Sequence, residues 1–105
     1  MKYGLSEQTI EQIHAVLRRH PQVQRAVLYG SRAKGCAKPG SDIDLTLVGG
    51  DDLTLDVLYR ISWELEELPL PYTVDLSLFH QIDDPELVEH IRRVGIVFYE
   101  RDSSI

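Results

Sequence analysis

The chain has 105 residues, 43% hydrophobic and 27% charged, which suits one domain with a modest core, so we expect a single domain over residues 1–105. Its formal net charge of −6 argues against binding to duplex nucleic acid, which needs a basic face. No apolar run approaches the ~20 residues of a membrane span, and the single cysteine, Cys36, excludes an internal disulfide. We therefore expect a cytoplasmic protein that does not bind membranes.

The first predicted elements are a helix and a buried strand. From Ser6 to about Arg19 the apolar residues fall at helical spacing, with Ser6 as the N-cap, and Pro21 stops the helix. An apolar strand then runs from about Val23 to Tyr29. This order predicts a helix packed on one face of a sheet.

A short basic segment follows the first strand. At Gly30 the missing Cβ lets backbone amides approach an anion, and Ser31 opens a short helix whose unpaired N–H groups favour phosphate. Arg32, Lys34 and Lys38 add positive charge. We predict ligand contact for Arg32, whereas Lys34 and Lys38 fit a solvated helix surface equally well.

The second predicted strand runs from Asp42 to Val48, and ten residues separate it from Ser31. The intervening loop turns the chain back, which predicts that the first two strands are antiparallel. Asp42 and Asp44 lie two apart, so both side chains project from one strand face with bases ~6.6 Å apart. Two such carboxylates suit a divalent cation, and Mg²⁺ prefers carboxylate and phosphate oxygens.

A helix and a third strand come next. Apolar residues from Leu55 to Leu68 trace one helical stripe that ends before Pro69. A helical crossover implies that the strands it joins are parallel. The third strand, about Tyr72 to Phe79, carries Asp75 as a lone acid among core residues. Asp75 can complete a carboxylate triad.

The last elements are a helix and an edge strand. Asp84 is the predicted N-cap, and Pro85 takes the first helical position. Apolar residues at helical spacing from Leu87 to Val94 form the inward-facing stripe of this helix, and Gly95 ends it. Residues 96–99 could add a short edge strand, and residues 101–105 read as a frayed tail. The predicted fold class is α/β (α+β), with a mixed β-sheet packed with helices.

These residues carry a family resemblance. Gly30-Ser31, ten residues, Asp42-Ile43-Asp44 and a later apolar-Asp75-apolar strand resemble the nucleotidyltransferase superfamily that includes DNA polymerase β and kanamycin nucleotidyltransferase. The segments Gly-Ser-Arg-Ala-Lys-Gly and Ser-Asp-Ile-Asp-Leu are most similar to those of the minimal nucleotidyltransferases, or MNT proteins. The resemblance covers nearly the whole chain and implies the polymerase-β-like nucleotidyltransferase fold.

The resemblance also implies an activity and a set of site residues. In that family the Gly-Ser pair holds the nucleotide phosphates, which assigns Gly30 and Ser31 to nucleotide binding. Arg32 is assigned to the same site by its positive charge. In that family the acids corresponding to Asp42 and Asp44 bind two metal ions. We expect Asp75 to be the third metal ligand, which completes the shell of the ion at the acceptor and helps to activate the acceptor hydroxyl. We expect transfer of AMP from ATP to a hydroxyl, with two Mg²⁺ ions.

The acceptor is expected to come from a second chain, because no basic groove is present. Minimal nucleotidyltransferases are typically encoded beside a HEPN-type helical protein, and some act as antitoxins that adenylylate a tyrosine of that toxin. Two alternatives remain: a non-catalytic antitoxin that neutralises its partner by contact, and a small-molecule nucleotidyltransferase. The presence of all three acids favours catalysis.

The helix of residues 55–68 also carries two aromatic residues away from its apolar stripe. Tyr59 and Trp63 are one turn apart and ~120–160° from the stripe's centre. They predict either a protein-contact patch or packing against another part of this domain.

Overall fold

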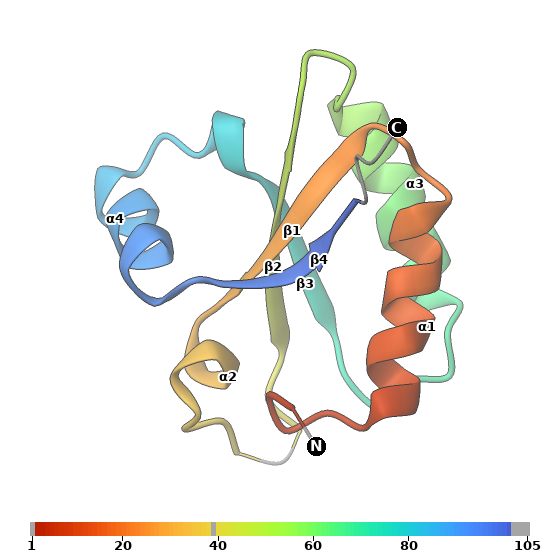
Figure 1. The fold of residues 1–105 in the computed structure, drawn as a ribbon, viewed down its shortest axis with the longest axis vertical. Helices are drawn as coiled ribbons and strands as arrows, with labels where there is room; N and C mark the ends of the chain where they lie inside the picture. Colours follow the sequence, from red (N-terminus) through yellow and green to blue (C-terminus); the bar gives the residue numbers. More distant parts are fainter. Residues whose placement is uncertain (1, 39, 102–105) are drawn as a thin grey trace.

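A computed structural model describes residues 2–38 and 40–101 and has a four-stranded sheet at its centre (Figure 1). The strands lie in the order β3-β2-β1-β4, with bounds Val23–Tyr29 for β1, Ile43–Gly49 for β2, Val74–Leu78 for β3 and Ile96–Glu100 for β4. β1 is antiparallel to β2 and β4, whereas β2 and β3 are parallel. The mixed sheet and both predicted pairings are confirmed. The predicted tail after residue 101 lies outside the described residues.

The helices are α1 (Glu7–Arg18), α2 (Ser31–Lys34), α3 (Leu55–Glu66) and α4 (Pro85–Val94), with a 3₁₀ turn η1 (Phe79–Gln81). Each of the three longer helices begins after a residue whose side chain accepts a hydrogen bond from a free backbone N–H group of the first turn. These caps are Ser6 before α1, Thr54 before α3 and Asp84 before α4. Local sequence therefore sets where these helices start.

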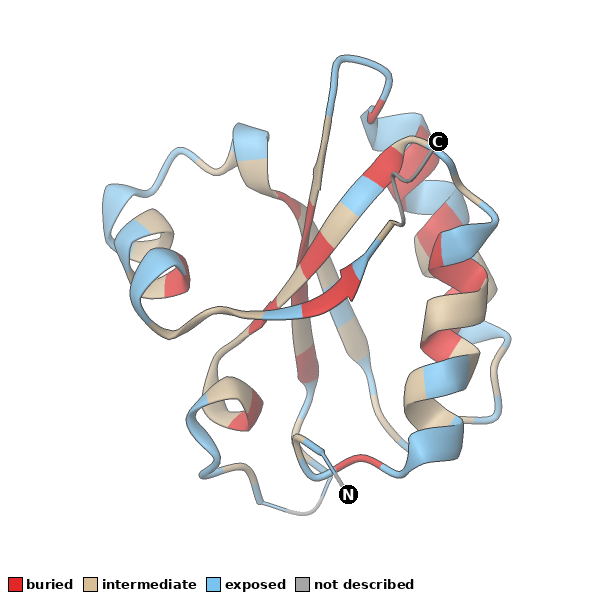
Figure 2. Cartoon of the chain, in the orientation of Figure 1, coloured by how far each residue is buried: buried red, intermediate tan, exposed pale blue. Residues whose placement is uncertain are grey.

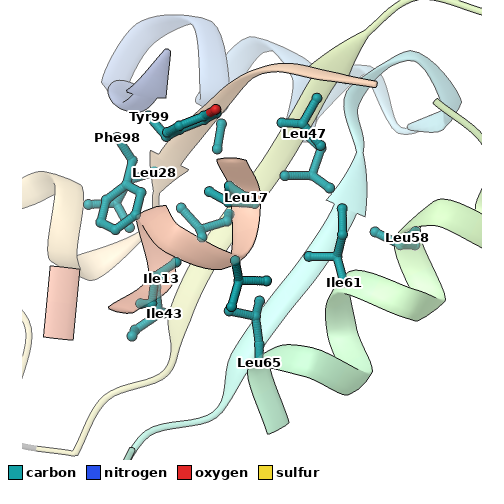
Figure 3. Packing of buried hydrophobic residues seen from close by; sticks show 14 of the residues in the cluster. Ile13, Leu17, Leu28, Ile43, Leu47, Leu58, Ile61, Leu65, Phe98 and Tyr99 are labelled. Carbon is teal, nitrogen blue, oxygen red and sulfur yellow. The ribbon is translucent and has the colours of Figure 1, made fainter. Parts of the chain in front are cut away.

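The hydrophobic core lies between the sheet and the helix pair α1 and α3, which run together along one side of it (Figure 1). Figure 3 shows Ile13 and Leu17 from α1 and Ile61 and Leu65 from α3 around side chains of the strands, such as Leu28. Buried residues follow the inward sides of both helices (Figure 2). α4 lies across the sheet from this pair and packs on β1. That opposite face is only partly covered.

Several predicted boundaries need correction. β2 begins at Ile43, one residue after Asp42, and β3 is shorter at both ends than predicted. α3 ends at Glu66, and Leu55 is 43% exposed, so it lies outside the buried stripe to which the sequence assigned it. Leu55 lies one helical turn before Tyr59, which is 62% exposed, so it belongs to the solvent-facing side of α3. In the described part of the chain, no helix has the length and apolar character needed to span a bilayer.

Gly95 follows α4 as predicted, but with φ −63° it is not in the left-handed conformation of a typical glycine cap. A Cβ at this position would lie 2.3 Å from the carbonyl oxygen of Ile91 and 2.7 Å from Cγ1 of Val27. Gly95 is therefore needed for the close approach of α4 to β1.

Candidate active site

Two of the three predicted acids lie side by side on the partly covered face of the sheet. Asp44, the second residue of β2, pairs directly with Asp75 of β3 on one side and with Tyr29 of β1 on the other. Directly paired residues of neighbouring strands point to the same face. Ile43 is fully buried on the opposite face, as predicted. Asp42 immediately precedes β2 and is exposed.

Asp44 lies in the field of both other acids. Burial raises the pKa of its carboxyl above the ordinary value, and the negative charges of Asp75 and Asp42 raise this pKa further. The positive charge of Arg32 and that of protonated His90 act in the opposite direction. A half-buried carboxylate that two nearby carboxylates repel is a site that a bound cation would stabilise.

The carboxylate oxygens of these acids are the donor type that Mg²⁺ prefers, so the residues fit the metal by their chemistry. Within residues 2–38 and 40–101, no three His, Cys, Asp or Glu side chains converge closely enough to hold a metal ion. The acids thus influence one another electrostatically without forming a closed coordination shell. Asp75 is exposed, not buried as its apolar neighbours suggested, because alternate residues of β3 face opposite sides of the sheet.

Gly30 lies directly against Asp44. Its φ of 78° and ψ of −155° belong to a region that essentially only glycine adopts. A Cβ on Gly30 would lie 2.4 Å from Oδ2 of Asp44. Ser31 follows as the first residue of α2, and no backbone hydrogen bond from its N–H group is found among the described residues. The Gly-Ser pair therefore lies next to the acids, as the motif predicted.

Arg32 points away from solvent. Only 3% of this residue is exposed, and its guanidinium donates hydrogen bonds to the main-chain carbonyls of Ser41 and Tyr3. Lys34 and Lys38 are exposed. Nucleotide contact by Arg32 remains a prediction, but the hydrogen bonds of its guanidinium are made with the protein's own backbone.

Two residues near the acids were not singled out from the sequence. The rings of Tyr29 and His90 meet edge to face with centroids 6.3 Å apart. This contact brings α4 close to the acid row, which is the neighbouring pair Asp44 and Asp75. Burial raises the pKa of the Tyr29 phenol, the Ser77 hydroxyl lowers it, and the nearby acids raise it again. Tyr29 ends an apolar run and His90 lies on an amphipathic helix, so neither carries a local signal. Only the packing of α4 on β1 brings them together.

Far from the acids, α3 exposes Tyr59 and Trp63, which are 62% and 66% accessible. They do not pack against another part of the described chain, so that alternative is wrong. Leu55 precedes Tyr59 by four residues on the same face of α3. The three side chains form an exposed apolar stripe, and its role as a contact patch stays a prediction.

Comparison with known proteins shows the family to which the chain belongs. Residues 11–104 match the family model "Polymerase beta, Nucleotidyltransferase". The probable protein adenylyltransferase MntA of Haemophilus influenzae is 34% identical over 77 residues, which cover 73% of this chain and 67% of MntA.

Two solved structures share the fold. A toxin-antitoxin crystal structure with AMP-PNP superimposes with a TM-score of 0.71 and 24% identity, over 88% of this chain and 73% of that chain. The MNT antitoxin in complex with a tri-AMPylated HEPN toxin of Shewanella oneidensis has a TM-score of 0.68 and 20% identity, over 92% and 74% of the two chains. The family match spans Gly30, Ser31 and all three acids, and the chain belongs to the polymerase β nucleotidyltransferase family.

Proposed function

We propose that this protein transfers AMP from ATP to a tyrosine hydroxyl of a HEPN-type helical toxin and thereby acts as its antitoxin. The observation that carries the proposal is the pairing of Asp44 with Asp75, beside Asp42 and against Gly30, in a chain of this family. The related MntA is named as a protein adenylyltransferase, and the HEPN toxin bound to the similar MNT antitoxin is tri-AMPylated. These two relatives support AMP as the transferred group and a protein as the acceptor.

The donor nucleotide would lie over the Gly-Ser pair. The N–H group of Ser31 makes no backbone hydrogen bond within the described chain and Gly30 has no side chain, so the β- and γ-phosphates can approach the backbone closely. Lys34 is exposed on α2 and is available to add positive charge. The AMP-PNP in the similar toxin-antitoxin structure supports ATP as the donor.

Asp42 and Asp44 would hold two Mg²⁺ ions, which supply charge stabilisation for the attacking and leaving oxygens of an in-line displacement. Asp44 is restrained in this role by Gly30 on one side and by its pairing partners Tyr29 and Asp75 on the others. Asp75 is exposed at the open end of this row, where an acceptor can reach it. We assign Asp75 to favouring deprotonation of the acceptor hydroxyl.

In the reaction the acceptor oxygen attacks the α-phosphorus of ATP and forms a new phosphoester bond. The bond from that phosphorus to the bridging oxygen breaks, pyrophosphate leaves, and the hydroxyl proton is lost on the side of Asp75. The products are pyrophosphate and an AMP-modified tyrosine.

The test uses the purified chain, a HEPN-type partner encoded beside it, Mg²⁺ and ATP labelled at either the α- or the γ-phosphate. We expect the α-label, and not the γ-label, on a partner tyrosine. Asp42→Asn and Asp44→Asn should lose transfer and stay folded. Asp51→Asn is the matched control, because Asp51 is an exposed acid beyond the far end of β2, roughly 20 Å along the strand from Asp44.

Each other result has a defined meaning. Near-normal turnover in Asp44→Asn would refute the assignment of the acids. Neutralisation of the toxin by both inactive variants, without label transfer, would show an antitoxin that works by contact alone. A label on a small molecule instead of the partner would show that the acceptor is a small molecule and not the toxin.

A further inference from the structure

Arg32 is a buried cation that forms no ion pair among the described residues. It is 3% exposed, and among the described residues no carboxylate oxygen lies within ion-pair distance of its guanidinium. Burying a charge is costly unless its hydrogen-bonding capacity is met. The acceptors of the guanidinium's hydrogen bonds therefore indicate the role of this side chain.

The guanidinium is held by backbone and by one aromatic ring. Nε and Nη2 both donate to the carbonyl oxygen of Ser41, at 3.2 and 2.7 Å, and Nη1 donates to the carbonyl oxygen of Tyr3 at 2.8 Å. The Tyr72 ring lies under the guanidinium, with its centroid 4.8 Å from Cζ. Tyr3 and Gly4 form a turn near the start of the chain. A Cβ on Gly4 would lie 2.9 Å from Nη1 of Arg32, so this turn is closely packed against Arg32.

The segments tied together by Arg32 are those that lead into the acids. Ser41 is the residue before Asp42, and Tyr72 lies three residues before Asp75, while Arg32 itself follows Ser31. One side chain thus connects the Gly-Ser segment to the backbone that enters β2 and to the segment before β3. The forked donation to Ser41 fixes that carbonyl in direction as well as in distance.

We infer that Arg32 is a positioning residue for AMP transfer and not a nucleotide ligand: it holds the Ser41 carbonyl and so fixes the backbone from which Asp42 projects. This inference rests on the proposed function for its catalytic consequence. Lysine is expected to replace Arg32 only in part, because a single ammonium does not present the planar fork that reaches Ser41 from two nitrogens while a third reaches Tyr3.

The first experiment measures the backbone directly and needs no substrate. The amides of Ser41 and Ile43 donate to the carbonyls of Lys38 and Thr73, at 3.0 and 2.9 Å, and their hydrogen exchange reports on this segment. In Arg32→Met we expect exchange of both amides to accelerate at least ~10-fold relative to the amide of Leu53, which donates to Gly50 beyond the other end of β2. Equal acceleration at Leu53, or none at Ser41 and Ile43, overturns the inference.

The second experiment separates positioning from ligand contact. A displacement of about 1 Å at a reacting group costs ~10²-fold in rate, so Arg32→Met should lower kcat by about that factor. Its Kd for ATP, measured by calorimetry, should stay within about twofold of the unmodified chain. Lys34→Met, which removes an exposed cation two residues away, is the control for hydrogen exchange only and should leave exchange at Ser41 unchanged.

A rise of tenfold or more in the Kd for ATP with unchanged kcat would make Arg32 a nucleotide ligand and refute the inference. If Arg32→Met fails to fold, Arg32→Lys keeps the charge and most of the stem and is expected to show the same pattern in weaker form. If the unmodified chain transfers no AMP, the proposed function fails, while hydrogen exchange still decides whether Arg32 holds the Ser41 backbone.

Discussion

Replacing Gly30 by alanine tests the contact on which the position of Asp44 depends. The new Cβ would lie 2.4 Å from Oδ2 of Asp44, about 1 Å closer than an ordinary van der Waals contact. The backbone at Gly30 is fixed by β1 before it and α2 after it, whereas Oδ2 is the far end of a side chain. The carboxylate will therefore move, and the collision will be relieved at the expense of the metal-binding geometry.

The expected magnitudes follow from this. A residue forced into the backbone conformation of Gly30 costs ~1–3 kcal/mol, and each kcal/mol lowers the Tm of a domain of this size by about 4–8 °C. Displacing a reacting group by about 1 Å costs ~10²-fold in rate. Gly30→Ala should therefore stay folded at 25 °C with a lower Tm, and its AMP transfer should fall by about two orders of magnitude.

Gly35→Ala is the matched control. Gly35 has the same φ of 78°, but a Cβ there would meet no atom within 4 Å. Its left-handed conformation costs a non-glycine residue ~1–2 kcal/mol, so the two variants lose comparable stability. AMP transfer and thermal melting are measured on both. If Gly30→Ala keeps as much activity as Gly35→Ala, the position of Asp44 against Gly30 does not matter for the reaction.

Four further predictions concern the acids, the phosphates and α3. The pKa of Asp44 is raised above 3.8 in the folded protein, so without metal the fold loses stability as the pH rises from that value through the raised pKa. In EDTA, the Tm of Asp44→Asn minus the Tm of the unmodified chain should therefore increase as the pH rises through this window. A decrease in that difference would contradict the predicted direction of the pKa shift. Asp75→Asn should keep its Tm, because Asp75 is exposed, while its turnover falls; a large loss of Tm would indicate a structural role. If Ser31 and the adjacent amides hold the β- and γ-phosphates, calorimetry should show much tighter binding of ATP than of AMP, and equal affinities would exclude that placement. Trp63→Ala should not change the melting curve, because Trp63 is 66% exposed, but should weaken binding of a helical partner in a titration; unchanged affinity would remove the α3 stripe from the interface.

The sequence determined the features that depend on neighbours along the chain. Ser6 and Asp84 cap helices by reaching backbone N–H groups two or three residues away, which is a local interaction. The alternation of Ile43, Asp44 and Leu45 sets which side chains are buried, because successive residues of a strand face opposite sides. The parallel pairing of β2 and β3 follows from the helix between them. Asp42 just before β2, Asp44 within it and their spacing from Ser31 are likewise local features, so the amino-acid sequence alone locates them.

Only the tertiary structure decided the features that depend on distant segments. The register that sets Asp44 opposite Asp75 joins strands separated by the whole of α3, and no local pattern fixes it. His90 reaches the acid row only because α4 packs on β1, and Asp75 is exposed because no element covers the sheet there.

Arg32 illustrates the difference most directly. In sequence it resembles a basic residue on a surface helix, and its charge beside a phosphate-type loop favoured ligand contact. Its guanidinium instead donates to the carbonyls of Tyr3 and Ser41, 29 and 9 residues away, and stacks on Tyr72. Whether an arginine meets solvent, a ligand or the protein's own backbone depends on which carbonyls the folded chain brings within reach, because a buried guanidinium is stable only where such acceptors surround it.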